Sequence, residues 1–373
     1  MISVVMSTYN GAQFIEEQLV SLLNQTRQPD EVLIGDDAST DNTIAIVRHF
    51  IDEHQLKNWR LIVNEQNKGW KRNFPELFLQ VKGDIIFYCD QDDVWLDEKI
   101  QTMAEIMERN EKILCLGSRY VSIDQNGERV AFDDLEDFHG TGGLEEVYSD
   151  SNKFTKSYWG CTLAFRNTLL HHMRDPRLFV SPDFLLCFTA ALNHGLYLLD
   201  AALIKHRFHM HNTTRSMDTL DQSHGEYTLG QRIEFIKGFY DVACNAITDD
   251  KKLQEQFTKF FGQQVKFLEH PSCGNAFKMM RMTNSLEGYI FALANISYTI
   301  GFNKLAGKIY AIKDLPIMST VYAKLCKIEG GQTPLTELAD GCLSLWYKAI
   351  RANNELLTRC SLQQMPTLYG GQL

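Results

Sequence analysis

Short apolar runs that alternate with helical patterns are the feature that most constrains the fold of the first half of this chain. Between them, apolar residues such as Ile15, Leu19 and Leu22 recur at helical spacing. Strands separated by helices predict an α/β fold with a doubly wound, mostly parallel, Rossmann-like sheet and right-handed crossovers. Such sheets bind ligands in the crevice outside the carboxyl ends of their strands. The strand-like runs are residues 2–6, 32–35, 61–63 and 84–89.

The fourth run ends on a dense group of carboxylates. Asp90, Asp92 and Asp93 follow directly after residues 85–89. Crowded carboxylates raise one another's pKa, and a cation relieves their repulsion. The Asp90-x-Asp92 pair therefore predicts a hard divalent ion, Mn²⁺ or Mg²⁺, held by few protein ligands and completed by phosphate oxygens and water. The alternative is a solvated acidic turn that caps the next helix.

Two other strands also end on polar residues. Strand one is followed by residues 7–10, and strand two runs into Asp36 and Asp37. Taken alone, Asp37 is best explained as a cap or turn residue. Because the carboxyl ends of parallel strands lie at one edge of the sheet, all three endings are expected to face one crevice. Their convergence favours a ligand site over isolated turns.

Length, charge and cysteine content limit the classes of protein that fit. A chain of 373 residues predicts two domains, or one large domain with an appendage. The net charge of -10 argues against nucleic-acid binding through a basic face. The nine cysteines are odd in number and include no C-x-x-C pair, which favours a reduced, cytoplasmic setting.

Membrane and export signals are weak in this sequence. Residues 1–6 lack a basic segment and predict a strand instead of a secretory leader. The longest apolar stretch, residues 289–302, is interrupted by polar side chains and is too short to span a bilayer. The prediction is a cytoplasmic protein, with peripheral contact at the inner face of the membrane left open.

Four motifs follow one another in the first hundred residues: residues 4–11 (VVMSTYNG), 21–26 (SLLNQT), 36–43 (DDASTDNT) and 90–95 (DQDDVW). In their order and spacing they resemble family 2 glycosyltransferases with the GT-A fold. The last motif is most similar to bacterial rhamnosyltransferase-like members, which build surface polysaccharides. The resemblance implies an inverting transfer of a sugar from a nucleotide-diphosphate donor.

The resemblance also implies roles for individual residues. Ser7 and Tyr9 would contact the nucleotide base, and Asp37 would accept the pyrimidine imide N–H. Asp92 would bind the metal, which neutralises the leaving diphosphate, with Asp90 nearer the ribose and donor. For Tyr9 the alternative is a packed aromatic whose hydroxyl merely reaches solvent.

The middle of the chain is expected to form the acceptor side. Residues 158–165 predict a strand that resembles a Gly-Cys strand near the donor sugar, which makes Gly160 a donor-binding candidate. A lone glycine in a strand more often marks a bulge or a close backbone approach. Asp93 would orient the acidic loop or meet the substrate. Residues 133–150, rich in Asp, Glu and Gly, predict a loop that shapes the acceptor pocket.

Asp183 is the candidate catalytic base, at the start of a helix predicted to run through Leu192. An inverting transferase needs a base for the acceptor hydroxyl, and a partly desolvated aspartate fits. The family commonly has an acid or a histidine just before this aspartate, whereas this chain has Pro182. Ser181 and Asp183 are also sound helix-start residues, which is the structural alternative.

A histidine-rich segment follows the next predicted strand. Arg207, His209 and Asn212 match an Arg-x-His-x-x-Asn pattern of the family, in which the cation meets the diphosphate and His209 the metal. A zinc cluster is disfavoured, because alternate residues of a strand point to opposite faces and no cysteine or carboxylate lies alongside. His206 and His211 have no assigned role.

Beyond about residue 216 the pattern becomes helical. Ile233, Ile236 and Phe239 share one face, and residues 335–356 show comparable spacing. We therefore expect a catalytic domain at residues 1–215 and a helical C-terminal domain at 216–373. The helices would support the catalytic domain, form a homo-oligomer, or place basic, apolar surface at 304–310 against a membrane that carries the acceptor.

The combined prediction is a metal-dependent glycosyltransferase that uses a UDP- or dTDP-sugar. Its acceptor would be a saccharide or lipid-linked oligosaccharide. A sugar-phosphate nucleotidylyltransferase is the alternative enzyme, but it would need a glycine-rich phosphate loop after strand one, where only Gly11 occurs. A non-catalytic partner that binds nucleotide-sugar is the third reading.

Overall fold

The fold is described from a computed structural model of the chain. It describes residues 1–130, 141–147, 158–174, 181–209, 229–245 and 250–270, and the single positions 248, 275, 278 and 279. Most of the predicted loop 133–150, Asn212, His211 and the predicted segments 304–310 and 335–356 lie outside these residues.

The first half of the chain forms the predicted parallel sheet. Its four strands lie side by side in the order β3-β2-β1-β4 and run in the same direction. Each helix between them crosses from one strand to the next, so the expectation of a doubly wound fold is confirmed. The elements are β1 (Ile2–Thr8), α1 (Ile15–Leu23), β2 (Glu31–Asp36), α2 (Thr43–Glu53), β3 (Trp59–Val63), α3 (Trp70–Phe78) and β4 (Ile85–Cys89).

The second half extends this sheet with mixed pairing. β8 is antiparallel to both β4 and β6, whereas β6 and β9 are parallel, and the full order is β3-β2-β1-β4-β8-β6-β9-β5 with β7 paired to β9. The elements are β5 (Val94–Trp95), α4 (Lys99–Arg109), β6 (Cys115–Ile123), β7 (Leu144–Glu146), β8 (Leu163–Arg166), a 3₁₀ helix (Asn167–Arg174), α5 (Pro182–Leu192) and β9 (Leu196–Arg207).

The predicted strand at residues 158–165 is only half correct. Gly160–Thr162 form a 3₁₀ turn, and the strand begins at Leu163. Both the backbone N–H and the hydroxyl of Thr162 donate to the Trp159 carbonyl, at 2.9 and 2.7 Å. These local bonds close the turn and keep residues 160–162 out of the strand.

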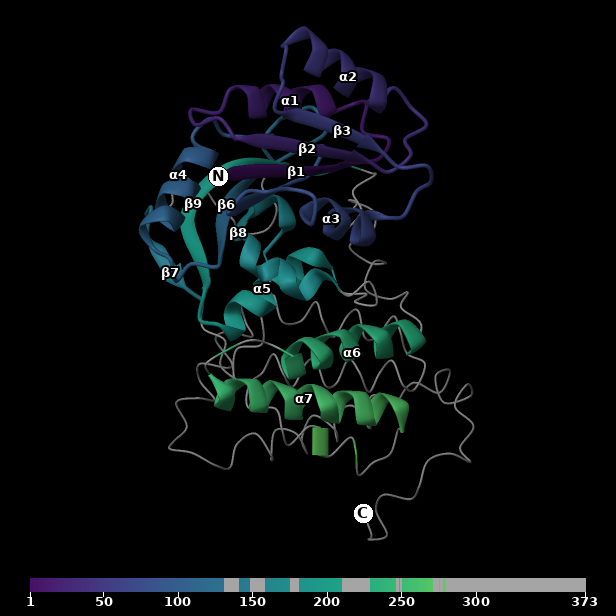
Figure 1. Ribbon diagram of the computed structural model, residues 1–373, viewed down its shortest axis with the longest axis vertical. Helices are drawn as coiled ribbons and strands as arrows, with labels where there is room; N and C mark the ends of the chain where they lie inside the picture. The colour runs from purple at the N-terminus through teal and green to yellow at the C-terminus, as the bar shows by residue number, and fades with distance from the viewer. Residues whose placement is uncertain are drawn as a thin grey trace.

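Two hydrophobic cores lie on opposite faces of the sheet (Figure 1). One core contains the buried faces of α1, α2 and α4, and the other contains those of α3 and α5. The second core continues into α6 (Leu229–Asn245) and α7 (Lys251–Glu269), which follow α5 in Figure 1. The strands that carry the polar endings are therefore packed against an apolar core on both faces, and this packing fixes the position of the sheet edge.

Phenylalanine side chains join α5 to the C-terminal helices. Phe188 of α5 contacts Phe239 of α6 and Phe261 of α7, with ring centroids 5.7 Å apart in both pairs. Ile236 and Phe239, predicted to share an apolar face, are both buried. None of the helices within the described residues has the length and apolar character needed to cross a bilayer.

Candidate active site

The register of the parallel strands brings the polar strand endings together. β1 lies between β2 and β4, with Thr8 beside Asp36 and Met6 beside Cys89. The residues that follow these strands therefore emerge next to one another at the carboxyl edge of the sheet. They include Tyr9 after β1, Asp37 after β2, and the acid loop, residues 90–93, after β4, while Ser7, the other predicted base contact, lies near the end of β1 itself.

Asp37 is buried, with 2% of its surface exposed, and shapes the loop that follows β3. Its carboxylate accepts hydrogen bonds from the backbone N–H groups of Lys68, at 2.9 Å, and Gly69, at 2.7 Å. The Asn64 side chain donates a further bond at 2.9 Å. Asp37 thus positions residues 64–69 beside the edge; its expected contact with a pyrimidine stays a prediction.

Two asparagines that sequence reasoning missed connect Asp37 to Ser7. Asn64 donates to the Asn73 side-chain oxygen at 2.9 Å, and Asn73 donates to Ser7 Oγ at 2.8 Å. Asn73 is also buried and bonds to the Gly35 carbonyl at 3.0 Å. A buried polar residue on the apolar face of α3 was the available sequence signal, because such groups need partners.

The loops after β1 and β2 hold left-handed backbone at non-glycine residues. Asn10 has φ 47° and Ala38 has φ 63°. Hydrogen bonds to the next loop fix the conformation of Asn10: its side chain accepts the Thr40 N–H at 2.8 Å, and its backbone N–H donates to Ser39 Oγ at 2.9 Å. Backbone strain of this kind gathers at functional sites.

Tyr9 is exposed, with 45% of its surface accessible. The alternative of a packed aromatic does not fit this exposure. Tyr9 directly follows β1 at the edge of the sheet, where an exposed aromatic side chain can cover a flat ligand. Its role as a base contact stays a prediction.

The acid loop contains one carboxylate without a hydrogen-bond partner among the described residues, Asp90. Burial raises the pKa of Asp90 well above its usual range, and the charges of Asp93 and Asp92 raise it further. Asp92 Oδ2 lies 2.8 Å from His209 Nε2. Asp92 and His209 thus offer a carboxylate and an imidazole side by side, two ligand types that a divalent ion accepts, and Asp90 lies two residues before Asp92 on the same loop.

Asp93 is fully buried and paired with His206, a residue to which the sequence assigned no role. Asp93 Oδ1 lies 2.8 Å from His206 Nδ1 and accepts the Arg207 N–H at 2.9 Å. Burial lowers the pKa of His206, but the charge and hydrogen bond of Asp93, together with the charges of Asp92 and Asp90, raise the pKa overall. For Asp93, burial raises the pKa, whereas His206 and the Arg207 N–H together lower it below its usual range. The two form a buried ion pair that anchors the acid loop to β9.

Cys161 completes a second group of ligand types with Asp93 and His206. The three ligand atoms lie within 4.8 Å of one another, and Asp93 Oδ2 has no partner. However, Asp93 Oδ1 and His206 Nδ1 already share a proton, and all three residues are buried. This group fits an ion pair beside a thiol better than a metal centre, because burial raises the pKa of the Cys161 thiol well above its usual range and a metal binds the thiolate.

Arg207 supports the acid loop through a hydrogen bond to its backbone. Only 1% of its surface is exposed. Its guanidinium donates to the Asp92 carbonyl at 2.8 Å and to the Asp124 carbonyl at 3.2 Å, and it pairs with Glu17 of α1. Its expected contact with the diphosphate stays a prediction, and the bonds present give it a structural task in holding Asp92.

Asp183 lies in the first turn of α5, as predicted, directly after Pro182. Its carboxylate accepts the Phe184 N–H at 2.8 Å. Burial raises the pKa of Asp183 above its usual range, although Ser181 and the N–H groups of Phe184 and Gly160 lower it in part. Asp183 is also close enough to Asp90 for its charge to raise the pKa of that carboxyl.

Gly160 brings the 3₁₀ turn against the end of β4. A Cβ at this position would lie 2.6 Å from the ring of Tyr88, so only glycine permits this approach. The Gly160 N–H thereby faces the Asp183 carboxylate. The structure thus brings Gly160, Asp183 and Asp90 together from three separate parts of the chain.

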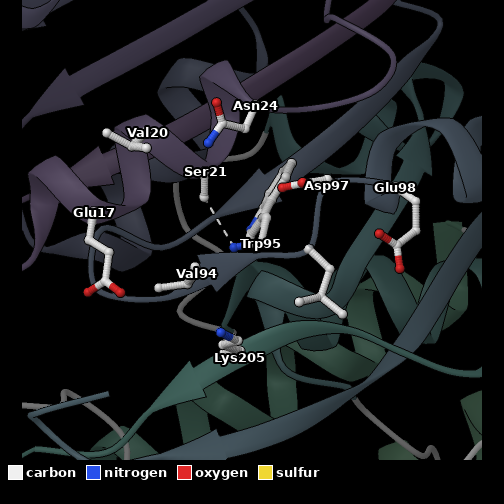
Figure 2. A pocket seen from close by; sticks show the side chains of 10 residues that line it. Glu17, Val20, Ser21, Asn24, Val94, Trp95, Asp97, Glu98 and Lys205 are labelled. Atoms are coloured by element: carbon white, nitrogen blue, oxygen red, sulfur yellow. Dashed lines mark hydrogen bonds between the residues drawn. The ribbon is translucent and has the colours of Figure 1, made fainter. Parts of the chain in front are cut away.

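A pocket of about 320 Å³ lies on the α1 side of β5 and contains none of the predicted site residues (Figure 2). There the backbone N–H of Trp95 donates to Ser21 Oγ at 3.1 Å, which is the bond drawn in Figure 2. Glu17, which pairs with Arg207, also lines this pocket. These contacts tie the chain that leaves the acid loop to α1.

Comparisons with known proteins agree with this architecture. The family model for glycosyl transferase family 2 matches residues 3–171. The chain is 26% identical to dTDP-rhamnosyl transferase RfbG of Shigella flexneri over 268 residues, which covers 68% of this chain and 88% of that protein. It is 30% identical over 126 residues to the E. coli UDP-Glc:alpha-D-GlcNAc-diphosphoundecaprenol beta-1,3-glucosyltransferase WfgD, covering 34% of this chain and 48% of WfgD.

Two further relatives match over about half of their length or less. The chain spans 51% and 34% of two glycosyltransferases from Haemophilus influenzae and Nostoc. Among solved structures, S. aureus TarS 1-349 in complex with UDP superposes with a TM-score of 0.53 at 18% identity, covering 84% of this chain and 92% of that chain. The expected GT-A fold is thereby confirmed.

Proposed function

We propose, given that residues 3–171 form a glycosyl transferase family 2 domain, that the chain is a metal-dependent inverting glycosyltransferase. It moves a sugar from a UDP- or dTDP-sugar to a saccharide hydroxyl in the synthesis of a bacterial surface polysaccharide or glycan. The observation that carries the proposal is that Asp183 lies near enough to Asp90 for its charge to raise the pKa of that carboxyl, beside the polar endings of β1 and β2. These are the groups that transfer requires at one place.

The donor would lie along the carboxyl edge of the sheet. Its base end meets Ser7, Tyr9 and the loop held by Asp37, and its diphosphate end meets the acid loop. Asp92 and His209 would hold Mn²⁺ or Mg²⁺, with Asp90 beside them, and the crowded charge of Asp90 supports a cation here. When bound, the ion supplies positive charge that stabilises the departing diphosphate.

Asp183 would accept the proton of the acceptor hydroxyl as that oxygen attacks the anomeric carbon. A base works best when its pKa approaches the working pH, and burial shifts the pKa of Asp183 in that direction. Its hydrogen bond to the Phe184 N–H orients the carboxylate. Gly160 would lie against the donor sugar, since its turn packs between Tyr88 and Asp183.

The choice of donor and acceptor rests on the relatives. RfbG is a dTDP-rhamnosyl transferase and WfgD uses UDP-Glc, so dTDP- and UDP-sugars are the donors to test first. The acceptor is a saccharide or lipid-linked oligosaccharide at the cytoplasmic face of the membrane. The helical domain at residues 216–373 would contact the acceptor, the membrane surface or a second copy of the chain.

The test measures sugar transfer and slow donor hydrolysis with UDP- and dTDP-sugars, in Mn²⁺, Mg²⁺ or EDTA. We expect activity only with metal, and loss of that activity in Asp92→Ala. Asp183→Asn should reduce kcat by roughly 10²- to 10⁴-fold while donor binding is kept. Asp52→Asn, an exposed position on α2, is the matched control.

Two outcomes contradict parts of the proposal. Full activity in Asp92→Ala would exclude the metal assignment. Donor binding without turnover in the wild-type protein, unaffected by Asp183→Asn, would instead identify a non-catalytic nucleotide-sugar-binding partner.

A further inference from the structure

The side chain of Gln91 joins the acid loop to the loop after β1. Its Oε1 accepts the backbone N–H of Tyr9 at 2.9 Å, and its Nε2 donates to the backbone carbonyl of Tyr9 at 3.0 Å. Regular pairing between β1 and β4 ends at Met6 and Cys89. Gln91 therefore continues the connection between the two strands beyond the point where their backbones separate.

Gly11 provides the space for this side chain. A Cβ at position 11 would lie 2.5 Å from Gln91 Cδ and closer still to Oε1. The backbone of Gly11 does not have positive φ, so glycine is needed here for the close approach of the amide. Gln91 and Gly11 thus form one matched pair, although they lie on different loops.

We propose that Gln91 is a positioning residue that holds the β1 loop, residues 9–11, and the acid loop at a fixed separation. This inference rests on the proposed function, in which the β1 loop meets the nucleotide base and the acid loop meets the metal and diphosphate. A nucleoside diphosphate must reach both loops at once. Gln91 sets their spacing so that both ends of the ligand bind together.

The physical basis is the gain from two-ended binding. Once one end of a ligand is bound, the other end binds at an effective concentration that depends on how well the two half-sites match its length. Both hydrogen bonds of Gln91 are made to protein, so its loss removes no expected ligand contact. The loss should therefore weaken a ligand that spans both loops more than a ligand that uses one.

The experiment compares four variants with the wild-type full chain: Gln91→Ala, Gly11→Ala, the double variant, and the exposed control Gln101→Ala on α4. Calorimetry gives Kd for UDP and dTDP with Mn²⁺, and for UMP and dTMP without metal. Because two hydrogen bonds are lost, we expect Gln91→Ala to weaken the diphosphates roughly tenfold. The monophosphates should stay within about twofold, because they do not engage the metal end.

The double variant makes the test specific. Gly11→Ala displaces the Gln91 amide, so it should match Gln91→Ala. Once Gln91 is Ala, the added methyl group has room, and the double variant should bind no more weakly than Gln91→Ala alone. Gln91→Glu, which still accepts from Tyr9 N–H but cannot donate to its carbonyl, should also weaken diphosphate binding and serves if Gln91→Ala does not fold.

Three results would overturn the inference: wild-type affinities in Gln91→Ala, equal losses for mono- and diphosphates, or additive losses in the double variant. Failure of the proposed function looks different. In that case the wild-type protein itself binds none of the four nucleotides and transfers no sugar, and the inference fails with it.

Discussion

The carboxyl groups at the edge of the sheet have different surroundings, and these separate their roles at the scale of the residue. Asp93 is held ionised by His206 and belongs to the support of the loop. Asp90 and Asp183 have raised pKa values and remain available to a cation or a proton. The acid loop, residues 90–93, thus contains both a carboxylate that supports the structure and a carboxyl group that can take part in binding.

The pH dependence of transfer tests the role of Asp183. As a base it must be ionised, so kcat should fall as the pH drops through its pKa. Burial raises that pKa above the usual value of about 3.9. The acid limb should therefore lie at a higher pH than the titration of an ordinary aspartate when kcat is measured at saturating donor and metal. Full activity through the pH range in which an ordinary aspartate becomes protonated would contradict this role, as would the same limb in the residual rate of Asp183→Asn.

Asp90→Asn should stabilise the metal-free protein while reducing transfer. The folded-state pKa of Asp90 is raised, so the stability linked to its protonated form is present at low pH and is lost as the pH rises through that pKa. At neutral pH the ionisation of Asp90 therefore favours the unfolded chain. Replacing Asp90 by a side chain that does not ionise should gain about 1 kcal/mol, or an increase in Tm of about 2–4 °C.

Thermal unfolding at pH 7 in EDTA measures this difference, with Asp52→Asn as the control for an exposed carboxylate. Saturating Mn²⁺ should reduce the difference, since the cation relieves the same repulsion in the wild-type protein. An unchanged or lower Tm for Asp90→Asn in EDTA would contradict the electrostatic account.

At the scale of the element, the site depends on close contacts between segments that have no local reason to meet. The 3₁₀ turn at 160–162 approaches the end of β4 only because Gly160 has no side chain, and Tyr88 fills the space. Tyr88 is itself packed against Phe74 of α3, with ring centroids 4.0 Å apart, so it has little room to move. The turn, β4 and α3 therefore place Gly160 as one packed unit.

Gly160→Ala should consequently harm both stability and activity. The new methyl group would overlap the Tyr88 ring, and overpacking of a buried site costs about 1–3 kcal/mol. It would also shift the Gly160 N–H away from Asp183, so kcat should fall more than donor affinity. Denaturant unfolding and steady-state kinetics measure the two effects.

Gly127→Ala is a control for substitution of a glycine away from this packed turn, where the backbone has φ 82°. It should lose stability through strain alone and keep kcat. If Gly160→Ala has the same unfolding free energy as the wild-type protein, the close approach to Tyr88 does not require glycine at position 160.

At the scale of the whole molecule, the sheet that carries the candidate site and the first C-terminal helices share one hydrophobic core. α5, which carries Asp183, packs through Phe188 on Phe239 and Phe261 of α6 and α7. The start of α5 is thus supported from the sheet on one side and from α6 and α7 on the other (Figure 1). The C-terminal helices contribute to the position of the proposed base.

Phe261→Ala tests this shared core. The ring is fully buried and contacts Phe188, Phe239 and Phe257, so its loss should cost about 3–5 kcal/mol. Because the core is continuous, we expect the GT-A domain and these helices to lose stability together, in one denaturant transition followed by tryptophan fluorescence and circular dichroism. Lys252→Ala, at an exposed position of α7, is the control. Two separate transitions, with only one displaced, would indicate independent domains.

The sequence by itself determined the parallel half of the sheet and the order of its helices. Apolar periodicity and polar strand endings are local properties, and parallel pairing then brings those endings to one edge, as β1, β2 and β4 show. Local patterns also placed Asp183 at a helix start. They failed at 160–162, where the bonds of Thr162 close a turn.

Only the tertiary structure decided which of these residues meet and which merely support the others. The pairing of Gln91 with Tyr9, of Asp93 with His206, and of Arg207 with the Asp92 carbonyl each joins segments far apart in the chain. No periodicity encodes such contacts, because they depend on strand order, on burial and on the space left by residues such as Gly11. Local sequence patterns thus identify the chemical groups, whereas tertiary packing determines how those groups are arranged.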